Sequence, residues 1–143
     1  MALNIYFAAP LFDDMELRRN EEECTKWEEA GFNVFLPQRD AGEAAVGADR
    51  AGLFISDTQA IEACDMLVAY IDGRVPDEGT VFEIGMAYAL HKPIALVRTD
   101  RRSFMQGHLN VMLECCGVVF KNTEDAIDYF KEVERSWLEL KNK

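Results

Sequence analysis

The segment that decides the fold runs from Met66 to Leu90 and reads MLVAYIDGRVPDEGTVFEIGMAYAL. Its first part, residues 66–71, is a short apolar run that predicts a buried strand, and residues 79–91 predict a helix. Four carboxylates lie between the two or just inside the helix: Asp72, Asp77, Glu78 and Glu83. Ligands of open α/β sheets bind at the carboxyl ends of the strands, so this segment predicts a ligand site.

Similar apolar runs recur on both sides of this segment. Further strands are expected at residues 4–9, 32–37, 94–97 and 118–120. Helices are expected at residues 13–30, at 53–63, and from Thr123, as the N-cap, to about 140. Residues 38–52 are expected to form a long loop that can include a helical turn. The alternation predicts an α/β fold with a five-stranded parallel sheet covered on both faces, in a single domain over residues 1–143.

Composition narrows the classes of partner. The chain has 143 residues, with 26 acidic and 15 basic side chains and a net charge of −11, which argues against nucleic acid and anionic membranes. No apolar run approaches the roughly 20 residues of a membrane-spanning helix, and no secretion signal is evident, so a cytoplasmic location is expected.

Cofactors are not expected either. The four cysteines form no CxxC pair and only two histidines are present, which makes a metal site improbable. No Walker loop or GxGxxG motif indicates ATP or NAD.

The carboxylates favour one kind of chemistry. Cleavage of a glycosidic bond commonly uses two of them, one at the anomeric carbon and one handling the proton of the leaving group. Glu83, between Phe82 and Ile84, suits the first role, and Asp77 suits the second. The turn at Gly79 would let both face one pocket.

Simpler explanations stay open for each of these residues. Asp77 and Glu78 could be plain helix caps, and Glu83 could form a structural ion pair. Asp57 could also be a cap, or it could lie within its helix. Taken alone, Tyr6 and Met112 are typical of core residues, and Asn110 is typical of a turn or cap.

Several segments together resemble the nucleoside 2-deoxyribosyltransferases. The most specific is D-x-G-T-x-x-E-I-G-x-A, which begins at Asp77 and ends at Ala87. The others are residues 5–12, Asp57 with the Cys64-Asp65 pair, Lys92-Pro93 and residues 109–113, all in the family's order. The resemblance implies a flavodoxin-like three-layer fold and transfer of 2-deoxyribose between purine or pyrimidine bases.

The resemblance also implies a role for each matching residue. Glu83 would attack C1′ and form a covalent deoxyribosyl-enzyme, and Tyr6 would orient its carboxylate. Asp77 would exchange a proton with the base, and Asp57 would lie at the base site.

Other residues are expected to bind substrate. Asn110 and Met112 would complete the sugar pocket of a neighbouring subunit, because members of the family are homo-oligomers, often dimers or hexamers. Asp72 and Gly79, in the same acidic segment as Asp77, are also expected among the substrate-binding residues. The partners implied are deoxynucleosides and free nucleobases.

Two other functions compete with this one. The first is hydrolysis of nucleotides, as in a branch related to this family that resembles deoxynucleoside 5′-monophosphate N-glycosidases. The segment after the first strand, residues 8–14, is apolar and then acidic, which disfavours a phosphate. A non-catalytic nucleoside-binding module is the third possibility, but it would have little use for a carboxylate in an apolar helix.

Overall fold

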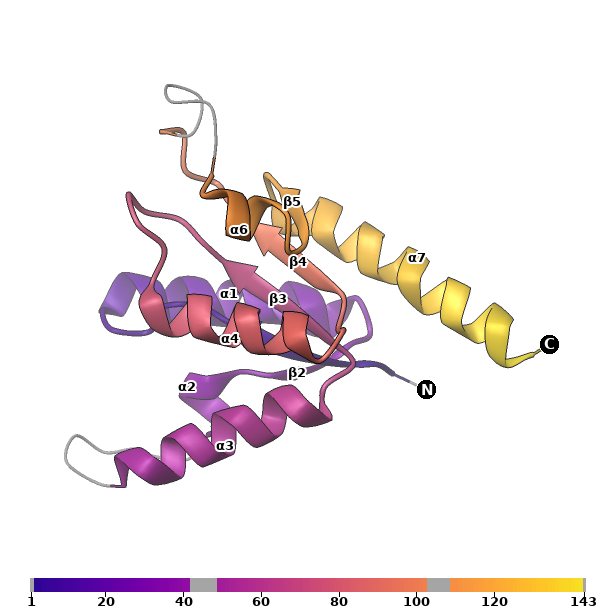
Figure 1. Cartoon of the computed structure of the whole chain (residues 1–143), viewed down its shortest axis with the longest axis horizontal. Coiled ribbons are helices and arrows are strands. Elements are labelled where there is room, and N and C mark those ends of the chain that lie inside the picture. Colours follow the sequence, from indigo (N-terminus) through magenta and orange to yellow (C-terminus); the bar gives the residue numbers. More distant parts are fainter. Residues whose placement is uncertain (1, 42–48, 103–108, 143) are drawn as a thin grey trace.

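A computed structural model of the protein describes residues 2–41, 49–102 and 109–142. Its centre is a five-stranded parallel sheet with the strand order β2-β1-β3-β4-β5 (Figure 1). The strands are β1 (Asn4–Ala8), β2 (Asn33–Phe35), β3 (Met66–Tyr70), β4 (Ile94–Val97) and β5 (Val118–Phe120). The order 2-1-3-4-5 is that of flavodoxin-like folds, so the predicted fold class is confirmed.

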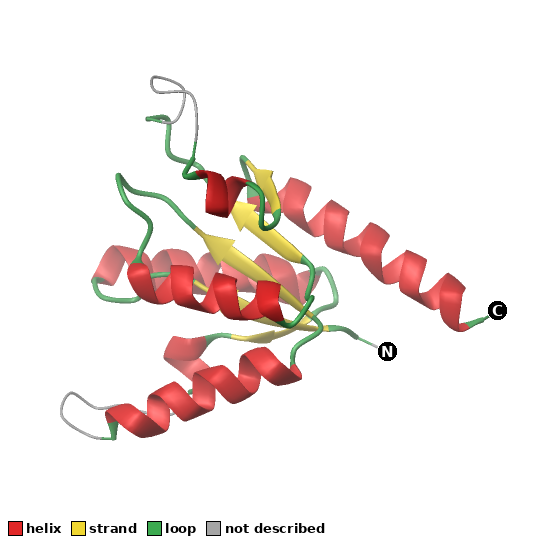
Figure 2. Cartoon of the chain, viewed as in Figure 1, coloured by secondary structure: helices red, strands yellow, loops and turns green. Residues whose placement is uncertain are grey.

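The described helices are α1 (Asp14–Glu29), α2 (Pro37–Asp40), α3 (Arg50–Ala63), α4 (Glu78–Ala89), α6 (Val111–Glu114) and α7 (Thr123–Lys141) (Figure 2). The helices predicted near residues 13–30 and 79–91 are confirmed to within a few residues. The loop expected at 38–52 begins with the helical turn allowed for it, α2, but the loop is shorter than expected because α3 begins at Arg50. Asp49 caps α3 through the Gly52 N–H, so Asp57 lies within the helix. Residues 42–48 of that loop lie outside the described residues.

The two faces of the sheet carry different layers. Strand residues alternate between the faces, so Ile5 and Phe7 join a core with α1 and α7, whereas Tyr6 and Ala8 join one with α3, α4 and α6. Figure 1 shows α3 and α4 in front of the sheet and α1 behind it. Both faces of the central strands are therefore buried, as expected for a parallel sheet.

The chain reverses direction across the sheet at β1. β2 lies on one side of β1 and β3 lies on the other. Right-handed crossovers then place α1 and α3 on opposite faces. The loops after β1 and β3 consequently diverge at the carboxyl edge, which opens space for a ligand between them.

The start of α7 differs from the prediction. The N-cap is Asn122, whose side chain accepts a hydrogen bond from the Asp125 N–H, and not Thr123. Thr123 is buried, and its hydroxyl lies 2.8 Å from that of Tyr70, which also accepts a hydrogen bond from Trp27. Local sequence would assign the cap to Thr123, but its hydroxyl is used in a tertiary contact with Tyr70 instead.

Within residues 2–41, 49–102 and 109–142, no helix has the length and apolar character needed to cross a membrane.

Phe130 offers a test of the α1–α7 layer. It is fully buried and packs against Trp27 with 5.4 Å between the ring centroids. Phe130→Ala should lower the free energy of unfolding by about 3–5 kcal/mol in urea denaturation, because it leaves a cavity in this layer. Leu140→Ala, at an exposed position of the same helix, is the matched control and should cost under about 0.5 kcal/mol. Equal losses from both variants would contradict the packing.

Candidate active site

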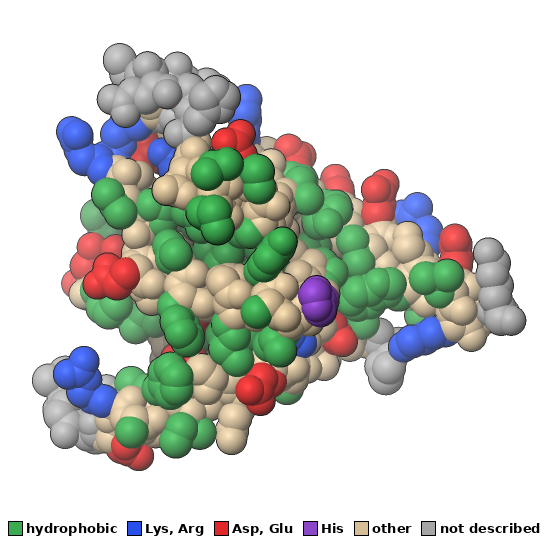
Figure 3. All heavy atoms as spheres, in the orientation of Figure 1, with side chains coloured by type: hydrophobic (Ala, Val, Ile, Leu, Met, Phe, Trp, Pro, Cys, Tyr) green, Lys and Arg blue, Asp and Glu red, His purple; other side chains and the backbone are tan. Residues whose placement is uncertain are grey.

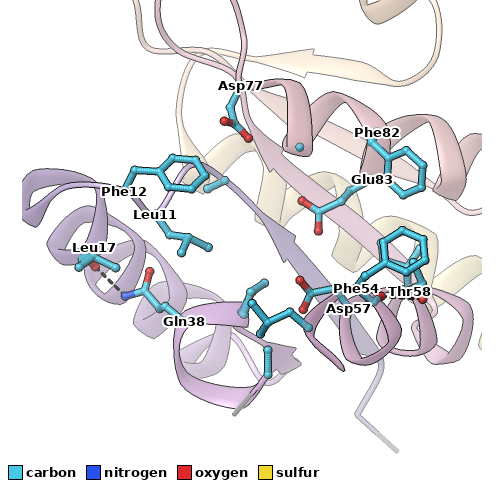
Figure 4. A pocket seen from close by; sticks show the side chains of 16 residues that line it. Leu11, Phe12, Leu17, Gln38, Phe54, Asp57, Thr58, Asp77, Phe82 and Glu83 are labelled. Atoms are coloured by element: carbon cyan, nitrogen blue, oxygen red, sulfur yellow. Dashed lines mark hydrogen bonds between the residues drawn. The ribbon is translucent and has the colours of Figure 1, made fainter. Parts of the chain in front are cut away.

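A cavity of about 610 Å³ opens where the loops after β1 and β3 diverge. In Figure 4, α3 and α4 form one wall, with Asp57, Asp77 and Glu83 pointing inward. Leu11 and Phe12 lie on the opposite side. Most of the remaining surface is apolar, so three carboxylates meet in a cavity that could receive an apolar ring with polar edges.

Glu83 is held by a tyrosine from β1. Tyr6 is fully buried, and its hydroxyl donates a short hydrogen bond to Oε2 of Glu83. The phenol ring stacks on Phe35 with 5.6 Å between the centroids, which fixes the direction of the hydroxyl. The ion pair considered for Glu83 is therefore absent among the described residues, and a neutral donor takes its place.

The surroundings of Glu83 change its titration. Burial raises the pKa of Glu83 to about 7, and the charges of Asp57 and Asp77 add to this, whereas the Tyr6 hydrogen bond opposes it. Burial and the adjacent Glu83 also raise the pKa of Tyr6, so the phenol stays protonated and remains a donor. Glu83 is thus a carboxyl group poised to change charge near neutral pH.

Asp57 faces the same cavity from α3. Burial raises the pKa of its carboxyl group above the ordinary value. Its Oδ1 atom is buried without a hydrogen-bond partner in the described structure. A buried carboxyl oxygen without a partner is costly, and a ligand that offers a polar edge would satisfy it.

Asp77 combines a cap with a place in the cavity wall. Its Oδ2 accepts hydrogen bonds from the Thr80 N–H at 2.9 Å and from the Thr80 hydroxyl at 3.1 Å, which caps α4. A Cβ atom on Gly79 would stand 3.2 Å from the same oxygen, so the glycine leaves room for this carboxylate. Capping and a role in the cavity are therefore compatible for Asp77.

The other predicted site residues lie elsewhere. Asp72 does not line the cavity, and its carboxylate accepts hydrogen bonds from Thr99 and Asp100. Asn110 caps α6 through the Met112 N–H, and the Met112 side chain is 76% exposed. Within one chain the structure therefore brings together Tyr6, Asp57, Asp77, Gly79 and Glu83, but not Asp72, Asn110 or Met112.

Sequence reasoning missed most of the other residues that line the cavity, among them two aromatic side chains and one amide. Phe54 and Phe82 lie at the mouth with 6.0 Å between their ring centroids. Phe54 precedes Asp57 by one helical turn, a spacing that could have revealed it. Gln38 also lines the cavity, but its amide is engaged by Asn20 and by the Leu17 carbonyl, a pairing that no local pattern signals.

Two features limit the ligands that this site could hold. Among the described residues, no group of three or more His, Cys, Asp or Glu side chains could hold a metal ion. None of the described residues that line the cavity is Lys or Arg. The arrangement suits a neutral organic ligand with polar edges better than an anion.

Comparison with known proteins identifies the family. A family model described as nucleoside 2-deoxyribosyltransferase matches residues 5–132, which is most of the chain. The chain belongs to the nucleoside 2-deoxyribosyltransferase family. The resemblance seen in the sequence is thereby confirmed, and the cavity is a candidate active site of this family of enzymes.

Individual relatives are more distant. A curated nucleoside deoxyribosyltransferase from Limosilactobacillus fermentum is 37% identical over 81 residues, an alignment that covers 50% of this chain and 48% of that protein. The match therefore spans about half the length of the curated relative. A conserved protein from Enterococcus faecalis has a TM-score of 0.79 and 28% identity, over 92% of this chain and 99% of its own.

Two further solved structures share the fold. A 2-deoxyribosyltransferase from Bacillus psychrosaccharolyticus has a TM-score of 0.75 and 23% identity, over 88% of this chain and 91% of its own. A CMP N-glycosidase from Clostridium botulinum has a TM-score of 0.59 and 20% identity, over 90% of this chain and 98% of its own. The fold thus supports more than one reaction at an N-glycosidic bond, and the site must decide between them.

The raised pKa of Glu83 predicts a pH-dependent effect on stability. In the unfolded chain Glu83 ionises near its ordinary value of 4.5, and in the folded protein it ionises near 7. Its contribution to folding is therefore fully present below pH 4.5 and is lost as the pH rises through 7, because the charged form is disfavoured in the cavity.

Glu83→Gln removes this charge and keeps an oxygen that can accept from Tyr6. The stability of the variant minus that of wild type, measured as the free energy of unfolding, should be larger at pH 8 than at pH 4.5. Chemical denaturation at both values measures this. A difference that is the same at both values would show that Glu83 ionises in the folded protein as it does in the unfolded chain.

Proposed function

We propose that the protein transfers 2-deoxyribose between nucleobases through a covalent intermediate on Glu83. The observation that carries this proposal is the Glu83 carboxylate, which lies in a largely apolar cavity beside two further carboxylates and accepts a hydrogen bond from Tyr6. Family membership supports the same reaction class.

The first half of the reaction follows from this geometry. Oε2 of Glu83 accepts from Tyr6, which leaves Oε1 as the attacking atom. The attack forms an ester with C1′ and breaks the bond from C1′ to the base nitrogen. The departing base takes a proton from an aspartic acid, for which Asp77 is our choice, and Asp57 offers a hydrogen bond to another edge of the base.

The second half is the reverse with a new base. Its ring nitrogen attacks C1′, its proton passes to Asp77, and the ester bond breaks to restore the Glu83 carboxylate. Each displacement inverts C1′, so the overall reaction retains the configuration. An oxocarbenium-like transition state forms more easily without an electron-withdrawing 2′-hydroxyl, which favours deoxyribose over ribose.

The competing functions have less support from this site. A nucleotide N-glycosidase must bind a phosphate, but the described lining residues include three carboxylates and no Lys or Arg. A pure binding module gains nothing from a carboxyl group with a pKa of about 7. Deoxynucleosides and free bases are therefore the proposed substrates. A cytoplasmic location is a separate proposal.

We also propose that the active enzyme is a homo-oligomer. Figure 3 shows hydrophobic side chains gathered over α4 and α6. The exposed residues there are Val81, Tyr88, Leu90, Val111 and Met112, which we call the α4–α6 patch. Such a patch is typical of a protein interface, and a second copy of the chain would bring Met112 and Asn110 towards a neighbouring site.

The proposed reaction is tested by mixing deoxyinosine with adenine, and thymidine with cytosine, and separating the products by chromatography. Transfer should appear as deoxyadenosine or deoxycytidine. Incubation with a 2-fluoro-arabinosyl nucleoside should trap an adduct on Glu83, located by mass spectrometry of the peptide. Glu83→Ala should lower turnover by at least about a thousandfold, because it removes the nucleophile.

One control variant and two further outcomes separate the alternatives. Glu78→Ala, on the exposed first turn of the same helix, should retain activity. Release of base from a deoxynucleoside 5′-monophosphate without transfer would instead support the hydrolase. An adduct on Asp77 would reverse the assigned roles.

The shared site is tested by complementation. Asn110→Asp keeps a side-chain oxygen that can cap α6 but loses the amide group, and we expect it to be inactive. Mixing it with inactive Glu83→Ala under conditions of subunit exchange should restore activity, because some sites then receive Glu83 from one chain and Asn110 from the other. Full activity of wild type that sediments as a 16.2 kDa monomer would refute the shared site.

A further inference from the structure

Two aspartates join the loops that follow β3 and β4, and neither lines the cavity. Asp72, after β3, accepts hydrogen bonds from the Thr99 N–H and hydroxyl, both at 2.6 Å, and from the Asp100 N–H at 2.8 Å. Asp100, after β4, accepts one in return from the Gly73 N–H at 2.9 Å. Each loop therefore supplies a carboxylate to the backbone of the other, and we call this pair the aspartate clasp.

Each aspartate of the clasp also contacts an arginine. Arg102 donates to Asp100 from its backbone N–H at 3.0 Å and from Nε at 2.9 Å. Arg19 of α1 lies 3.7 Å from Oδ2 of Asp72. The clasp is thus connected to α1, the helix behind the sheet, as well as to both loops.

The connection through α1 continues to the opposite wall of the cavity. Asn20, next to Arg19, is buried and donates to the Pro10 carbonyl at 2.9 Å and to Oε1 of Gln38 at 3.0 Å. Pro10 precedes Leu11, and both Leu11 and Gln38 line the cavity. Polar contacts therefore run from the β4 loop through the clasp to the far wall.

The loop that the clasp holds ends at Asp77. It turns at Gly73, whose φ of 110° suits glycine, and reaches Asp77 four residues later, where α4 begins. The cap to Thr80 fixes Asp77 relative to α4 only. The clasp fixes the start of the same loop relative to the β4 loop and α1.

We propose that Asp72 and Asp100 are positioning residues, whose reciprocal hydrogen bonds hold the 72–77 loop so that Asp77 stands at the correct place for proton transfer. This inference rests on the proposed function, in which Asp77 exchanges a proton with the base. It replaces the substrate contact expected for Asp72 from the sequence. Misplacing a catalytic group by about 1 Å can cost about a hundredfold in rate, so a clasp outside the cavity can control the chemistry within it.

Thr99 provides the sharpest test, because it is exposed and lies outside the cavity. Thr99→Val removes the hydroxyl bond to Asp72 and keeps the side-chain shape, whereas Thr99→Ser keeps the hydroxyl. Asp72→Ala removes Asp72's side of the clasp. Thermal unfolding of each variant shows whether the fold survives, and Thr99→Val decides the test if Asp72→Ala does not fold.

Two readouts distinguish positioning from a general structural role. Amide hydrogen exchange of the peptide that spans residues 73–77 should accelerate in Thr99→Val but not in Thr99→Ser. In the same variant, kcat for transfer from a natural deoxynucleoside should fall by about tenfold or more with KM nearly unchanged. Cleavage of a 2-deoxyribosyl donor with a 4-nitrophenolate leaving group, which needs little protonation, should change less than about twofold.

Other results would overturn the proposal. Equal losses with both donors would mean that the clasp only supports the fold. A raised KM with unchanged kcat in Asp72→Ala would instead support the expectation from the sequence that Asp72 contacts the substrate. Unchanged exchange at residues 73–77 in Thr99→Val and Asp72→Ala would show that the clasp does not order the loop. A wild type that transfers no deoxyribose would refute the proposed function and the role of Asp77, while the exchange data would still report separately on the loop.

Discussion

The hydrogen bond from Tyr6 to Glu83 joins β1 to α4, and the rest of the site is arranged around it. Tyr6 reaches Glu83 because β1 and β3 are neighbours and because α4 follows β3 onto the face towards which Tyr6 points. The strand order 2-1-3-4-5 is therefore a condition of the contact. The contact in turn supplies a donor to a carboxylate that burial would otherwise leave without compensation.

Helix capping explains how further polar groups come to the edge of the sheet. An N-cap residue stands where a loop enters a helix, and at the carboxyl edge of a parallel sheet this is also where ligands bind. Asp77 shows the consequence, since its Oδ2 caps α4 while its carboxylate faces the cavity. A cap in such a place is therefore no evidence against a chemical role.

The sequence predicts the parts of this structure that depend on local pattern. The strands, the fold class and the convergence of Glu83 and Asp77 on one cavity follow from apolar runs, turn residues and the position of the carboxylates. The start of α3 was missed because a glycine, Gly52, lies in its first turn and lowers the apparent helical propensity. The partner of Asp72 lies 27 residues away, at Thr99, and no periodicity encodes such a pairing. The placement of Met112 against a substrate would need a second chain, which no pattern within one chain describes.

The three carboxylates in the cavity together favour the binding of a proton at the site. Glu83, Asp57 and Asp77 face one cavity, and burial together with the charges of the two aspartates raises the pKa of Glu83. Coupling of this kind is reciprocal, so a proton on an aspartate removes its negative charge and lowers the pKa of Glu83 in turn. The proposed reaction needs one ionised nucleophile and one protonated acid in the same cavity at the same time. Burial and repulsion among the three carboxylates oppose full ionisation of the site, because full ionisation would place three negative charges together in an apolar cavity without a cation among the described lining residues.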